Sequence, residues 1–129
     1  MKDYKKPSIV RTDDMAEGIY AASGGADGSY SVSMRTNDKL NKKNRLCIWF
    51  TPSRVGNPVG RPVVVVTFNC PIGNIEFHNF NCDYTGLNTT TLKFYLTDDL
   101  IGKDECNVSV DAVNETQRPI VVSYSMTTE

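Results

Sequence analysis

Residues 62–69, Pro-Val-Val-Val-Val-Thr-Phe-Asn, contain the longest apolar run of the chain. Four valines followed by Phe68 are apolar on both faces of a strand, as expected of a central strand that lies between two neighbours. The run has the length of a strand and is too short to span a bilayer as a helix. We therefore expect residues 62–69 to form the most buried strand of a β-sheet.

Short β-branched and aromatic runs, separated by Asn, Gly, Asp and Pro, lie on both sides of this segment. Tyr30, Val32 and Met34 alternate with polar residues, which indicates a strand with one face turned to a core. Further strands are expected at 29–36, 45–51, 75–80, 90–96, 107–113 and 120–126. The sequence thus predicts an all-β fold, an antiparallel immunoglobulin-like or jelly-roll-like β-sandwich of about seven strands.

The charges of the chain nearly cancel. Its 129 residues include 14 basic and 15 acidic side chains, for a formal net charge of −1. This balance provides no global field that would draw the protein onto nucleic acid or an anionic membrane. The length suits a chain with one hydrophobic core. We expect a single sandwich domain at 26–129, with no cofactor, no nucleic-acid partner and no transmembrane segment.

Four cysteines, Cys47, Cys70, Cys82 and Cys106, are too widely spaced for a C-x-x-C pair. With a single histidine in the chain, this spacing argues against a structural zinc site. Two disulfides in an oxidising compartment and four buried thiols in a reducing one both fit the count. We favour disulfides, with all three pairings open.

Residues 1–25, MKDYKKPSIVRTDDMAEGIYAASGG, show no strand-like alternation and end on small residues. Arg11, Asp13 and Asp14 interrupt the apolar stretch that a general secretory signal requires. A peptidase that cuts after two glycines needs residues that thread a narrow channel, and Gly24 and Gly25 suit it sterically. We expect an export leader that is cleaved after this pair, with an unprocessed tail or a leader cut by an unrelated enzyme as the alternatives.

The segment YKKPSIVRTDDMAEGIYAASGG, residues 4–25, resembles the N-terminus of small exported proteins of Gram-positive anaerobes that share an A-E-G-[VI]-Y-A-A-S-G leader motif. The body is similar to theirs at Tyr30-Ser31-Val32, at Phe68-Asn69-Cys70-Pro71 and in the Thr-rich stretch Thr89–Leu92. Its strand pattern is similar to cellulose-binding and cohesin-like sandwich modules. The leader also resembles the double-glycine leaders that peptidase-containing ABC transporters cleave. The resemblance implies export to the cell surface, and it implies no activity.

Catalytic and metal sites find little support in the sequence. His78 is expected on a strand that turns Glu76, His78 and Phe80 to one face, and no cysteine has a neighbouring base that would activate it. We therefore expect no enzymatic activity. The acidic residues Asp98, Asp99 and Asp104 surround Gly102 and form a weak calcium candidate, although their spacing differs from that of an EF-hand and a solvated acidic turn is favoured.

A basic loop contains Lys39, Lys42, Lys43 and Arg45. Such a loop suits an anionic wall polymer, and it equally suits a hairpin that only protects a sheet edge.

Aromatic rings on a flat sheet face are typical of glycan-binding sandwiches, where nearby amides bond the sugar hydroxyls. The candidate rings are Trp49, Tyr84 and Tyr95, and the candidate amides are Asn79 and Asn81. Trp49 alternates with core residues and should point outward, unless it packs beneath a loop or against the second sheet. We expect an exported, non-catalytic recognition module that binds polysaccharide or a surface protein. The alternatives are a structural subunit of an extracellular assembly and a leader-processed, toxin-like effector.

Overall fold

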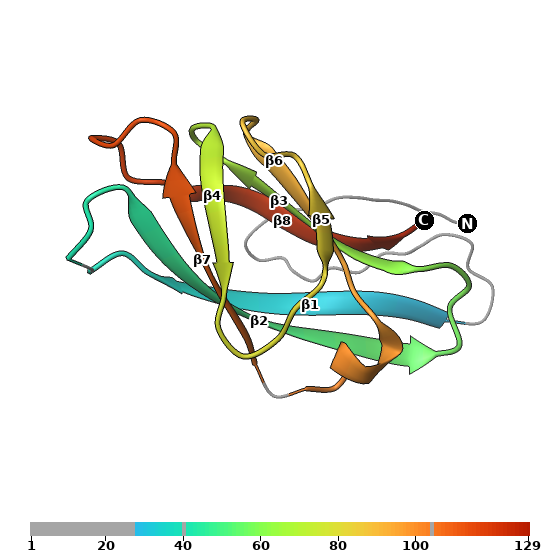
Figure 1. The fold of residues 1–129 in the computed structure, drawn as a ribbon. Helices are drawn as coiled ribbons and strands as arrows, with labels where there is room; N and C mark the ends of the chain where they lie inside the picture. The colour runs from blue at the N-terminus through green and yellow to red at the C-terminus, as the bar shows by residue number, and fades with distance from the viewer. Residues whose placement is uncertain (1–27, 40, 104) are drawn as a thin grey trace.

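The computed structural model describes residues 28–39, 41–103 and 105–129, which form two antiparallel four-stranded sheets packed as a sandwich (Figure 1). Sheet A has the order β1-β2-β7-β4, and sheet B has the order β5-β6-β3-β8. The strands are β1 (Gly28–Asn37), β2 (Arg45–Gly56), β3 (Pro62–Phe68), β4 (Ile72–Phe77), β5 (Asp83–Thr85), β6 (Thr91–Tyr95), β7 (Cys106–Ala112) and β8 (Val121–Thr128). The predicted all-β sandwich is confirmed, with eight strands in place of about seven.

Two connections, β1–β2 and β5–β6, join strands that are neighbours in one sheet. Every other connection between these strands crosses from one sheet to the other, as in Greek-key and jelly-roll sandwiches. The crossing from β6 to β7 contains η2 (Asp98–Leu100), a single 3-10 turn. Because the crossings alternate between the sheets, each sheet is fixed against the other and presents a defined outward face.

The inner strands β3 and β7 have the largest fractions of buried residues among the described strands. In β3, which lies between β6 and β8, five of seven residues are buried, whereas in β7, between β2 and β4, six of seven are buried. The expectation that the valine-rich strand would be the most buried is therefore wrong. The reason is that Ser109 and Asp111, on the outward side of β7, are covered by long polar side chains of neighbouring strands.

Aromatic rings join the two sheets in the core. Phe50 of sheet A stacks on Phe94 of sheet B with their centroids 6.1 Å apart, and Phe77 meets Phe94 edge-on at the same distance. Phe80 packs edge-on against Phe50 at 5.5 Å and against Phe77 at 5.0 Å. Such pairs add about 1 kcal/mol each to the burial of their area. The rings fix the spacing of the sheets beneath the two outward faces.

β4 differs from its predicted range. It begins at Ile72 and ends at Phe77, so Phe80 lies beyond it and packs in the core. The expectation that Phe80 shares a face with Glu76 and His78 is wrong, because the chain leaves sheet A there to cross to sheet B. The short strand β5 was not predicted, since its three residues are all exposed and show no apolar alternation.

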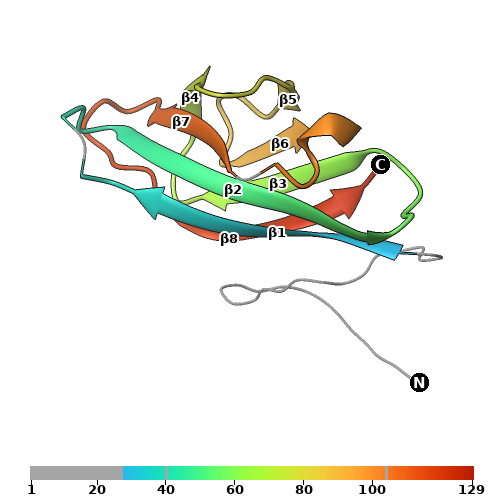
Figure 2. The same cartoon turned by 90° about the horizontal axis from the view of Figure 1, so that it is seen from below.

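One long side of the sandwich is formed by β1 and β8, which belong to different sheets. Figure 2 shows these two edge strands side by side, with β2 and β7 continuing sheet A beyond β1. The outward face of sheet A is therefore broad and continuous from β1 to β4.

Candidate functional site

The outward face of sheet A carries polar, charged and aromatic side chains from all four of its strands. Strand alternation places them there, because the residues between them fill the core. Cross-strand pairing arranges them in three rows, which are Arg45, Asp111 and Asn74, then Cys47, Ser109 and Glu76, and then Arg35, Trp49 and Asn107. We call this surface the A face.

Trp49 lies half-buried on the A face beneath Arg35. The Arg35 Cζ atom is 4.2 Å from the centroid of the indole ring, within the range of a cation–π contact. Arg35 also forms a bidentate pair with Glu105, from Nε to Oε2 at 2.8 Å and from Nη2 to Oε1 at 2.9 Å. The hydrogen bonds from Arg35 lower the pKa of Glu105. Trp49 thus points outward, as alternation predicts, with a fixed guanidinium over its ring.

Asp111 is the deepest charge of the A face, with its side chain 5% exposed. Its carboxylate accepts bonds from Arg45 Nε at 2.8 Å, from Lys42 Nζ at 2.9 Å and from Asn74 Nδ2 at 3.2 Å. Burial opposes ionisation, but these donors outweigh it and hold the pKa of Asp111 at about 2. Arg45 also pairs with Glu76 at 3.1 Å. The predicted basic loop thus uses two of its four cations to neutralise a buried acid.

His78 and Ser109 form a side-chain pair next to this network, with 2.7 Å between Nε2 and Oγ. A serine bonded to a histidine is part of many hydrolytic sites. Here Ser109 is 4% exposed, which leaves little room for a substrate, and Glu76, the cross-strand neighbour of Ser109, is paired with Arg45. The pair therefore serves to hold the chain that follows β4 against β7.

Both ends of the Asn79 amide bond to backbone groups at the start of β7, on either side of Cys106. Its Nδ2 donates to the Glu105 carbonyl at 2.7 Å, and its Oδ1 accepts from the Asn107 N–H at 2.7 Å. Because His78 N also donates to the Asn107 carbonyl at 3.0 Å, the amide extends the β4–β7 pairing beyond the last residue of β4. Asn81, the other candidate amide, is exposed in the following loop.

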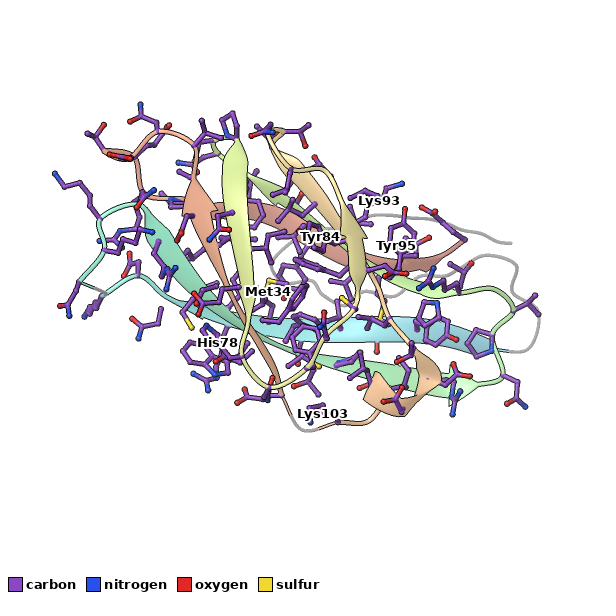
Figure 3. The ribbon with its side chains drawn as sticks, viewed as in Figure 1. Met34, His78, Tyr84, Lys93, Tyr95 and Lys103 are labelled. Atoms are coloured by element: carbon purple, nitrogen blue, oxygen red, sulfur yellow. The ribbon has the colours of Figure 1, made fainter. Side chains whose placement is uncertain are left out.

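The three candidate aromatic rings lie on three different surfaces. Trp49 belongs to the A face, whereas Tyr84 on β5 packs against Phe77 with the ring centroids 5.8 Å apart. Tyr95 is on the outward face of sheet B, with Arg61 Cζ 5.2 Å from its ring centroid. Figure 3 shows both tyrosines well separated from His78 of the A face. Of the candidate glycan-binding residues, Trp49 and Asn79 are those that the structure brings to one side of the molecule.

All four cysteines are free thiols, so the two expected disulfides are absent from this structure. Cys47 faces outward on β2, while Cys106 faces the core three residues further along the sheet. Cys70 follows β3 and Cys82 precedes β5, at opposite ends of sheet B about 20 Å apart at the rise of a strand. A disulfide needs Cα atoms less than about 7 Å apart, so this geometry excludes the arrangement that pairs Cys47 with Cys106 and Cys70 with Cys82.

The calcium candidate lies around η2. Asp98 and Asp99 are exposed there, and the Thr97 hydroxyl donates to the Asp99 carboxylate, while Asp104 is outside the described residues. Within the described ranges, no group of three or more His, Cys, Asp or Glu side chains is arranged to hold a metal ion. Gly102 has a φ of +86°, so the loop makes a tight turn at this point.

Two further expectations concern the chain as a whole. The leader with Gly24 and Gly25 lies outside the described residues. Among the residues that are described, no helix has the length and apolar character that crossing a bilayer requires.

Several residues of the A face were not predicted from the sequence. Arg35, Glu105, Asn107, Ser109 and Asp111 are separated by up to 76 positions and meet only through the β1-β2-β7 pairing. One signal was present, since Asn107, Ser109 and Asp111 are alternate polar residues of a strand whose other residues are apolar. Strand order, which decides their neighbours, is not encoded in that alternation.

No protein-family model, curated protein or solved structure matches this chain. Its function is therefore argued from the described surfaces.

Proposed function

We propose that the protein is an exported, non-catalytic recognition module that binds a surface protein of the cell through the A face. The leader motif and its resemblance to exported proteins of Gram-positive anaerobes support the export. The pre-arranged side chains of the A face support the binding. A catalytic role finds no support there, because Ser109 is buried and Asn79 is engaged by backbone groups.

The observation that carries the proposal is the stack of Glu105, Arg35 and Trp49. Trp and Arg are the residue types most often responsible for affinity in protein interfaces. Here the bidentate pair fixes the guanidinium on the indole ring, so little side-chain entropy would be lost when a partner binds. A rigid, partly apolar centre surrounded by polar side chains is the usual anatomy of a protein interface.

A carbohydrate ligand is the second candidate, because the half-buried Trp49 also offers a ring to a sugar. A sugar that stacks on this ring must displace Arg35, which breaks the bonds to Glu105. A protein partner needs no such displacement, and it gains the guanidinium as a contact. The geometry therefore favours a protein over a glycan.

Arg35→Ala separates these two candidates, since the expected effects have opposite signs. The full chain, wild type and variant, is immobilised and exposed to surface proteins released from Gram-positive cells, and in parallel to cellulose, xylan and cell-wall glycan. Loss of retention of a surface protein in Arg35→Ala supports the protein interface. A gain of glycan binding in the same variant supports stacking on the uncovered indole.

The matched controls are Arg61→Ala and Tyr95→Ala, which remove an analogous cation–π pair from the other sheet. Trp49→Ala should strongly weaken either kind of binding. The proposal is wrong if the wild type retains neither protein nor glycan, or if the control variants lose binding as strongly as Trp49→Ala.

A further inference from the structure

Cys82 and Cys106 are cysteines that the fold directs into the same part of the molecule from different sheets. Cys106 begins β7 of sheet A and is fully buried in the core. Cys82 directly precedes β5 of sheet B and packs against the same core. The sequence, in which the two residues are 24 positions apart, does not predict that they lie in the same part of the molecule.

The Asn79 amide fixes the chain before Cys82 onto the start of β7. It bonds the Glu105 carbonyl and the Asn107 N–H, the backbone groups on either side of Cys106. The crossing from sheet A to sheet B is thus attached at the position of the second cysteine.

The next residues lead inward from this attachment. The Phe80 ring packs on Phe50 with the centroids 5.5 Å apart, and Phe50 is the cross-strand partner of Cys106. Cys82 follows Phe80 by two residues, and both side chains are partly buried against the core. Pairing and packing therefore connect Cys106 through Phe50 to Phe80, which lies two residues before Cys82.

The electrostatics of the two thiols agree with this arrangement. Burial, with a smaller contribution from the neighbouring Cys106, raises the pKa of Cys82 to about 12. Burial also raises the pKa of Cys106, to about 11. Both groups are therefore protonated thiols at neutral pH in the folded protein, and attack by a folded-state thiolate is slow.

We propose that Cys82 and Cys106 form one disulfide between the sheets when the chain folds in the presence of a small disulfide oxidant, while Cys47 and Cys70 remain thiols. One cysteine thiolate attacks a sulfur of glutathione disulfide, whose S–S bond breaks and releases one glutathione. The second cysteine thiolate then displaces the other glutathione from the mixed disulfide. The protein loses two electrons and two protons, and the oxidant leaves as two thiols.

The expected role of this bond is structural. It would join the short edge strand β5 to the central strand β7, and it would close a loop of roughly 25 residues, for which chain-entropy arguments predict substantial stabilisation. Because both pKa values are raised, the bond suits oxidation during folding better than rapid switching. The inference is independent of what the A face binds.

The test is to refold the full chain in a glutathione redox buffer, block the remaining thiols by alkylation and map the peptides. Trypsin and a glutamate-specific protease together cleave after Arg45, Arg54, Glu76, Lys93 and Glu105, which puts each cysteine in a peptide of its own. We expect a linked pair of peptides 77–93 and 106–115, alkylated Cys47 and Cys70, and a melting temperature on the order of 10 °C above that of the reduced protein.

Cys82→Ser should abolish the linked peptides and the difference in melting temperature between oxidising and reducing buffer. Cys70→Ser, the matched control, should preserve both. The inference is overturned if the refolded wild type has four alkylated cysteines, a different linked pair, or glutathione attached to Cys82. The wild-type peptide map decides the question even if a variant folds poorly.

Discussion

The two sheets of this sandwich use their outward faces in different ways. On the A face, polar side chains are buried under one another, as the 5% exposure of the Asp111 side chain and the 4% exposure of Ser109 show. On sheet B, the outward positions are mainly hydroxyl and valine side chains. These are Val63, Val65, Thr67, Thr91, Ser123, Ser125 and Thr127.

The ion pairs around Asp111 differ from those of sheet B in the same way, whereas the Arg35–Glu105 pair of the A face, with its side chains 59% and 41% exposed, does not. On sheet B, Arg61–Asp83 and Lys93–Glu129 lie at exposed positions, where both partners are 41% exposed or more. Exposed pairs of this kind contribute about 0–1 kcal/mol. On the A face, Asp111 has three different donors, and a buried carboxylate is stable only with such compensation. The same strand alternation thus yields a passive surface on one sheet and an organised one on the other.

The largest expected difference between the two faces is in the free energy of unfolding that is lost when a carboxylate is removed. Asp111→Ala leaves Arg45, Lys42 and Asn74 without their shared acceptor, and we expect it to lower the free energy of unfolding by about 3 kcal/mol. Asp83→Ala on sheet B should cost less than about 0.5 kcal/mol. Urea denaturation of both variants measures the difference. Equal losses would show that the A face is no better organised than sheet B.

The contribution of Asp111 to stability should also depend on pH. The pKa of Asp111 in the folded state is lowered to about 2 from an ordinary 3.8, so its stabilisation is fully present above pH 4–5 and is lost as the pH falls toward 2. The loss expected over this range is about 2 kcal/mol. Asp111→Asn should reduce the slope of stability against pH. An unchanged slope, measured by urea denaturation at a series of pH values, would contradict the assigned network.

Removing the Asn79 amide should lower the free energy of unfolding by a smaller amount, and Asn81 is a nearby control. Asn79→Ala removes two hydrogen bonds to the backbone of β7, and we expect a loss of about 1–2 kcal/mol. Asn81→Ala, two residues along the same loop, should change the unfolding free energy by less than about 0.5 kcal/mol. Thermal denaturation distinguishes them, and similar losses would mean that Asn79 does not hold this edge of sheet A.

Much of the fold follows from local pattern. The seven predicted strands exist, because alternation and valine-rich runs are strong signals, and Trp49 points outward as its neighbours Ile48 and Phe50 require. The strand β5 was missed because it has no apolar alternation. The burial of β7 was underestimated, since Ser109 and Asp111 appear to be exposed polar residues until the side chains that cover them are known.

The site was less predictable than the fold. Trp49 and Asn79 were identified, but the partners that define their roles, Arg35 and Glu105, come from distant parts of the chain. Tyr84 and Tyr95 were grouped with them by residue type, and the strand order places each on another surface. Residue type predicts which side chains are suited to binding, whereas topology decides which of them meet.

The most direct test of the A face as the binding surface is the affinity of Trp49→Ala and Tyr95→Ala for a surface protein that the immobilised wild type retains. The two variants remove comparable aromatic rings from the two sheets. We predict that Trp49→Ala weakens binding by roughly 30-fold, as expected of a central interface residue, and that Tyr95→Ala changes it by less than about 2-fold. A loss in Tyr95→Ala with none in Trp49→Ala would place the interface on sheet B and contradict the account.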